Sequence, residues 1–98
     1  MKISTICLIF FVTVFSSVAK NKKVVFVAGA KSHGFFAHEH AAGCMLLAKH
    51  LEDANIGITT QVVTDSGYPK DVSVFDDAAA VVVACDGGVR HLLNKHLK

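Results

Sequence analysis

The chain has 98 residues, of which 52% are hydrophobic, and its formal net charge is +2 at pH 7. Such a length allows one small domain at most. The sequence contains no basic patch with interleaved aromatic residues, no charge run and no repeat, which argues against a nucleic-acid partner.

The first 19 residues have the features of a signal peptide. A lysine stands near the start, residues 6–15 form a compact apolar stretch, and small residues precede the expected cut after Ala19. The apolar stretch is shorter than the roughly 20 residues that span a bilayer, so we expect a cleaved signal and no stable membrane anchor. The sequence therefore predicts a secreted or periplasmic protein whose domain is formed by residues 20–98.

Three segments predict the strands of one sheet. Residues 24–28 and 78–84 are continuous apolar runs, which are typical of strands buried on both faces. Residues 58–63 include polar side chains and predict a strand nearer to an edge of the sheet. The segments between these strands decide how they are connected.

Helical spacing of apolar residues predicts a helix over residues 39–54, which Asn55 and Gly57 would end. Residues 72–77 predict one helical turn, and a second helix is expected from about His91 to Lys98. This alternation of strands and helices is typical of an α/β protein with a parallel sheet and right-handed crossovers.

Polar residues gather after two of the predicted strands. The segment GAKSHGFFAHEH, residues 29–40, holds three histidines and a glutamate, and Asp86 to His91 follow the third strand. Ligands of parallel sheets bind at the carboxyl ends of the strands, where we expect these two loops to meet. Because imidazole titrates near neutral pH, His33 or His38 is a candidate general acid or base.

The remaining polar residues have more than one interpretation. Glu39, His40 or Asp86 would orient the catalytic imidazole or hold a metal ion, although a solvated polar loop without chemistry stays open. Glu39 also suits the first turn of a helix, where a carboxylate interacts favourably with the helix dipole. The sequence has no His-x-x-x-His pair of the kind that binds zinc on a helix.

Two further motifs do not predict a site. Residues 31–34 lack the glycine patterns of dinucleotide-binding and P-loop proteins. Cys85 lacks a glycine two positions before it, which a nucleophile elbow needs. Cys44 and Cys85 could form a disulfide in an oxidising compartment, or remain two separate buried thiols, and both alternatives stay open.

Several motifs together resemble the start of ThuA-like (trehalose utilisation) domains of the class I glutamine amidotransferase-like superfamily. The resemblance covers residues 22–98 and corresponds to the N-terminal half of the family domain. The matching pieces are the first strand with Gly29, then Ser32-His33-Gly34, His38-Glu39-His40, Ala42-Gly43, and Asp86-Gly87-Gly88 with His91.

The resemblance implies a flavodoxin-like parallel sheet with strand order 2-1-3, as a truncated three-layer α/β/α fold. It also implies a role in sugar metabolism, with trehalose-type glycosides as the substrate class and no glutaminase cysteine. A divalent metal ion is the one cofactor that the pocket suggests, with His38, His40 and Asp86 as its ligands. The pocket and catalytic residues that the resemblance implies are Ser32, His33, His38, Glu39, His40, Asp86, Gly87 and His91.

Two alternative functions follow from the same residues. Because the family domain is about twice as long, the chain is alternatively a non-catalytic remnant, or a half-domain that needs a partner chain. In the second alternative it is a small exported metal-binding protein whose loop histidines converge with His91. In either case the third strand, residues 78–84, would have a free apolar edge through which copies of the chain associate.

Overall fold

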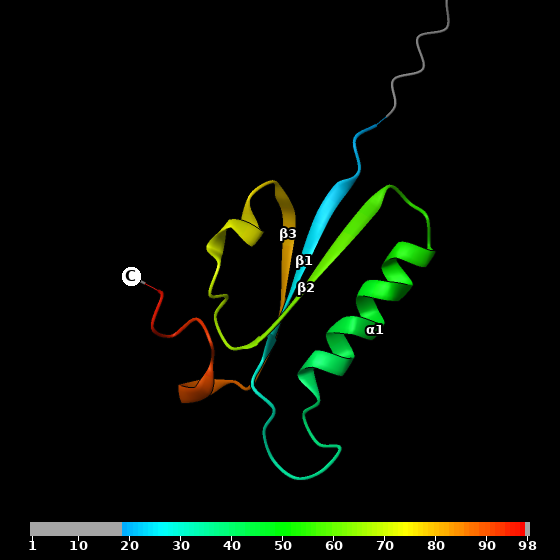
Figure 1. The fold of residues 1–98 in the computed structure, drawn as a ribbon. Coiled ribbons are helices and arrows are strands. Elements are labelled where there is room, and N and C mark those ends of the chain that lie inside the picture. Colours follow the sequence, from blue (N-terminus) through cyan, green and yellow to red (C-terminus); the bar gives the residue numbers. More distant parts are fainter. Residues whose placement is uncertain (1–18, 98) are drawn as a thin grey trace, which may run out of the picture.

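The computed structural model describes residues 19–97 (Figure 1). The expected signal peptide therefore lies outside the described residues, except for Ala19. Among the residues described, no helix combines the length and apolar character needed to cross a membrane.

Three parallel strands form a single sheet in the order β2-β1-β3 (Figure 1). They are β1 (Lys22–Gly29), β2 (Ile58–Ser66) and β3 (Ala78–Ala84). The central strand β1 is buried from Val24 to Gly29, as its unbroken apolar sequence predicts. The predicted α/β class, the parallel sheet and the 2-1-3 strand order are confirmed.

Helix α1 (His40–Asp53) covers one face of the sheet (Figure 1). Side chains two apart on β1, including Phe26 and Ala28, pack there against Cys44 and Ala48, which are one helical turn apart. The far end of α1 is tied to β2, because the Glu52 carboxylate accepts hydrogen bonds from the amide and the hydroxyl of Thr60, at 3.0 and 2.7 Å. These contacts fix the start of α1 next to the end of β1.

Short irregular segments cover the other face of the sheet. Val25 and Val27 are buried beneath the 3₁₀ turn η1 (Val72–Phe75) and Leu92. An apolar cavity of about 330 Å³ remains beside β3, lined in part by Val81 and Val83. The third layer of the predicted three-layer fold is therefore represented by turns, and α1 is the one α-helix of the described chain.

The predicted helix from His91 to Lys98 was wrong. The structure has the 3₁₀ turn η2 (Gly88–Arg90), followed by hydrogen-bonded turns as far as the described chain goes. A helix of about two turns does not offset its nucleation cost. Local hydrogen bonds from side chains replace the helix. His91 Nδ1 accepts a hydrogen bond from the Leu93 amide at 3.2 Å, and the Asn94 side chain donates one to the Gly88 carbonyl at 2.7 Å.

Candidate functional site

Two loops meet at the carboxyl end of the sheet. Residues 30–39 connect β1 to α1, and Asp86 follows β3 two positions after its last residue (Figure 1). The strand ends approach closely because Gly29 has no side chain. A Cβ atom on Gly29 would lie 2.5 Å from Cys85 Cβ and 3.1 Å from Cys85 Cα. This close approach brings Asp86 beside the loop after β1.

Three polar side chains, from that loop and from the start of α1, form hydrogen bonds with one carboxylate oxygen. Asp86 Oδ1 accepts a hydrogen bond from the Ser32 hydroxyl at 2.8 Å. It also lies 2.9 Å from His38 Nδ1 and 3.3 Å from His40 Nε2. We call Ser32, His38, His40 and Asp86 the Asp86 cluster. Its four members come from segments at least 46 positions apart, and the pairing of β1 with β3 joins them.

The hydrogen bonds of the cluster favour the ionised form of Asp86. The bond from Ser32, followed by those from His38 and His40, holds the pKa of the Asp86 carboxyl well below its ordinary value, although partial burial acts in the opposite direction. The carboxylate side chain is 13% exposed, and Arg90 Nη1 lies 3.5 Å from its second oxygen. Asp86 is thus a well-fixed anion at the end of β3.

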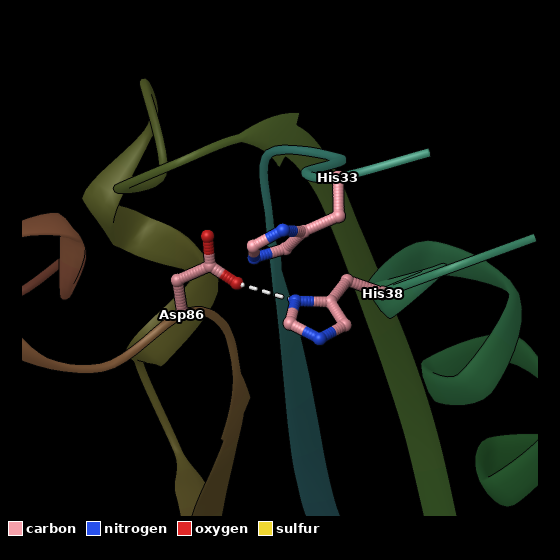
Figure 2. A group of neighbouring side chains, drawn as sticks. All are labelled: His33, His38 and Asp86. Carbon is pink, nitrogen blue, oxygen red and sulfur yellow. Dashed lines mark hydrogen bonds and ion pairs between the residues drawn. The ribbon is translucent and has the colours of Figure 1, made fainter. Parts of the chain in front are cut away.

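Two imidazoles of the loop face this anion (Figure 2). The rings of His33 and His38 meet edge to face, with their centroids 4.3 Å apart, and both residues are exposed. Both have left-handed backbone geometry, with φ of 64° and 49°. Such geometry is uncommon for residues other than glycine and often occurs at functional sites. In this loop conformation both rings lie on the side of Asp86 (Figure 2).

Asp86 separates two open hollows. One has a volume of about 500 Å³ and is lined by the three loop histidines together with Gly87. The other has a volume of about 570 Å³ and is lined in part by Ser32, Tyr68 and His91. Titratable and hydrogen-bonding side chains stand in both walls next to Asp86, so a polar ligand in either hollow would contact this carboxylate or its partners.

Most of the predicted site residues lie at this position. The Asp86 cluster contains four of them, His33 stands against His38, and Gly87 lines the smaller hollow. His91 borders the larger hollow instead. Glu39 does not join the cluster, because it forms an ion pair with Lys31 at 2.5 Å.

Other residues of the site region were missed or left open by the sequence. Arg90, in η2, lies next to Asp86. Its position four residues after Asp86 was the sequence feature from which this ion pair could have been predicted. Cys44 and Cys85 are both free thiols in the structure. Cys44 belongs to α1 and is buried between this helix and β1, which raises the pKa of its thiol. Cys85 is half-buried against Gly29.

The potential metal ligands differ from those expected. His38, His40 and Asp86 were predicted as the set. The structure brings one ligand atom each of His33, His38 and Asp86 within 4.8 Å of one another. His40 reaches the same carboxylate oxygen, but its ring centroid lies 5.7 Å from that of His38.

No family model, curated protein or solved structure matches this chain. The ThuA-like resemblance of the sequence therefore stays a prediction. The geometry around Asp86 provides the structural basis for a functional proposal.

Proposed function

We propose that this chain is an exported ThuA-like domain protein that acts on a sugar of the trehalose-type glycoside class. The observation that carries the proposal is the Asp86 cluster, which lies on the rim of an open hollow at the carboxyl ends of β1 and β3. This is the position at which parallel α/β sheets bind their ligands. The sequence motifs of the resemblance fall on the same residues.

His38 is the candidate general acid or base. Its Nδ1 atom faces Asp86 Oδ1 at 2.9 Å, which fixes the ring and leaves Nε2 available for a substrate proton. An ionised carboxylate behind an imidazole also stabilises the imidazolium that forms during proton transfer. The His38 side chain is 49% exposed, so a bound substrate has access to the ring.

The lining of the smaller hollow suits a substrate rich in hydroxyl groups. Imidazoles and the Asp86 carboxylate offer both hydrogen-bond donors and acceptors, and the Arg90 side chain adds further donors. Its volume of about 500 Å³ falls within the range of small-molecule sites. A disaccharide-sized substrate therefore suits the volume of this hollow, and these side chains are available to bind its hydroxyl groups.

The test is turnover of trehalose and of oxidised disaccharides by the chain, with and without added divalent metal ions. We expect the His38→Ala variant to lose about 10²- to 10⁴-fold in kcat, the usual contribution of a positioned acid or base. His50→Ala serves as the control, because His50 is exposed near the other end of α1. Equal turnover by the wild type and His38→Ala, or no turnover at all, would contradict the proposal.

A half-domain completed by a partner chain is the second candidate. The observation in its favour is the edge strand β3, on which Val81 and Val82 are 45% and 37% exposed. In that case the monomer has no turnover, and activity appears only when a second copy of the chain associates through β3. Measuring activity against protein concentration separates the two candidates, since a monomeric enzyme has a specific activity independent of concentration.

A further inference from the structure

Three polar atoms of the Asp86 cluster form a nearly equilateral triangle. Ser32 Oγ lies 2.8 Å from Asp86 Oδ1, His38 Nδ1 lies 2.9 Å from the same oxygen, and Ser32 Oγ lies 3.0 Å from His38 Nδ1. With Asp86 ionised, the serine hydroxyl and one ring N–H supply two hydrogens for these three contacts. Straight hydrogen bonds can account for at most two sides of the triangle.

The size of the triangle matches the spacing of ligands around a metal ion. Neighbouring ligand atoms of an octahedral ion with bonds of about 2.1 Å lie about 3.0 Å apart. The three atoms therefore have the spacing of one face of such a coordination shell. His33 adds a second imidazole, since its ligand atom lies within 4.8 Å of those of His38 and Asp86 (Figure 2).

We propose that His33, His38 and Asp86 bind one divalent first-row transition-metal ion, with the Ser32 hydroxyl as an additional oxygen donor. Both histidines are exposed and border the smaller hollow, so an ion has a path from solvent. The ligand atoms of the three residues lie within 4.8 Å of one another, so binding of one ion needs the His33 ring to move closer to the other two.

The donor set decides which ions bind. Two imidazole nitrogens and one carboxylate oxygen suit zinc, iron, cobalt and nickel, whereas magnesium and calcium prefer oxygen ligands alone. The set also differs from the one that the sequence predicts, because it contains His33 in place of His40. A loss of affinity in His33→Ala therefore supports the structural set, because the sequence-based set does not contain His33.

The inference rests on the same hollow as the proposed function, but in the metal-bound form His38 Nδ1 binds the ion instead of donating to Asp86. Its test contains no sugar. The full chain, freed of metal by a chelator, is titrated with Zn²⁺ by calorimetry. We expect one ion per chain and at least a tenfold loss of affinity in His33→Ala and in His38→Ala. The matched control is His50→Ala, which removes an exposed histidine of α1 and leaves the affinity unchanged. Titration with Mg²⁺ is expected to give no saturable binding.

A second readout locates the ion directly. When Co²⁺ or Zn²⁺ is added, the imidazole signals of His33 and His38 should shift in NMR spectra, while that of His50 stays in place. Circular dichroism checks that each variant keeps the wild-type fold. Unchanged Zn²⁺ affinity in His33→Ala, a loss of affinity in His50→Ala, or the lack of saturable binding would each overturn the inference. Zinc binding without any sugar turnover would support it and contradict the proposed function.

Discussion

Gly29 is the residue that lets the ends of β1 and β3 approach each other. The atoms nearest to its missing side chain belong to Cys85 and to the carbonyl of Ala84, which are held by β3 or lie directly beyond it. They are unable to move aside as the tip of a long side chain would. The position of Asp86, the next residue after Cys85, depends on this contact.

We expect Gly29→Ala to destabilise the chain by about 1–3 kcal/mol, the usual cost of forcing a methyl group into a packed site. Gly43→Ala is the matched control, since it makes the same change within α1, where no atom beyond the neighbouring helix backbone lies within 4 Å of the new Cβ. That variant should gain about 0.5–1 kcal/mol, because alanine favours a helix over glycine. Urea unfolding of both variants measures the difference, and equal stabilities would contradict the close approach at Gly29.

Asp86 gives the stability of the chain a predicted dependence on pH. The pKa of its carboxyl is lowered in the folded state by the Ser32 hydrogen bond and then by the His38 bond, so ionisation stabilises the folded chain. This contribution is fully present above the unfolded-state pKa of about 3.9 and declines as the pH falls towards the folded-state pKa. The difference in unfolding free energy between wild type and Asp86→Asn should therefore shrink between about pH 5 and pH 2.

Urea unfolding across that pH range checks the prediction. The pKa values of Glu52 and Asp71 are also lowered, by hydrogen bonds from Thr60 and Ser73. Both carboxylates are present in wild type and variant, so their contributions cancel in the difference. A difference that stays constant down to pH 2 would mean that the Asp86 carboxylate does not stabilise the fold.

The sequence predicts the position of a site residue only where that residue follows the end of a predicted strand. Asp86 and His38 follow apolar strands of a parallel sheet, and this pattern was enough to place them together. The ion pair between Glu39 and Lys31 could not be predicted from the sequence, because it depends on how the loop backbone turns at positions of positive φ. The same turns bring His33 rather than His40 towards His38.

At the scale of elements, the strands were easier to predict than the helices. β1 and β3 contain continuous apolar runs, and β3 coincides with the predicted segment 78–84. The polar ends of β1 and β2 extend beyond the predicted bounds, since main-chain pairing continues there without apolar side chains. The helix expected from His91 failed, because apolar spacing over two turns does not show whether tertiary contacts will support a helix.

The edge strand β3 predicts self-association. Within residues 19–97 it pairs with β1 alone, and it carries neither charge nor proline, two of the features that usually protect a sheet edge. We expect the wild-type chain to elute as concentration-dependent oligomers in size-exclusion chromatography. Val82→Lys should shift the chain towards the monomer, since Val82 is partly exposed and lysine disfavours edge-to-edge pairing.

Gln61→Lys is the control for this experiment. It adds the same charge to an exposed position on β2, the opposite and more polar edge strand. We expect it to leave the elution profile unchanged. A wild-type chain that stays monomeric at every concentration would contradict association through β3.

The whole molecule has two unequal sides. A regular helix closes the face that contains Phe26, while η1 and the turns near Leu92 close the face that contains Val25 and Val27. The first arrangement gives a continuous core, and the second leaves an apolar cavity beside β3. The candidate site lies where both sides end, so the loop after β1 and the turns after β3 shape its walls.

The separation of Ser32 and Asp86 by 54 positions gives the site a thermodynamic role. Any molecule or ion that bridges the two segments binds only to chains in which β1 and β3 are already paired. Binding of such a ligand therefore shifts the folding equilibrium towards the folded chain by mass action. At a concentration of 100 times Kd, this linkage adds about 2.7 kcal/mol to the free energy of unfolding. For a small domain that is a substantial fraction of the total. Ligand supply would then set how much of the chain is folded, as well as how much is occupied.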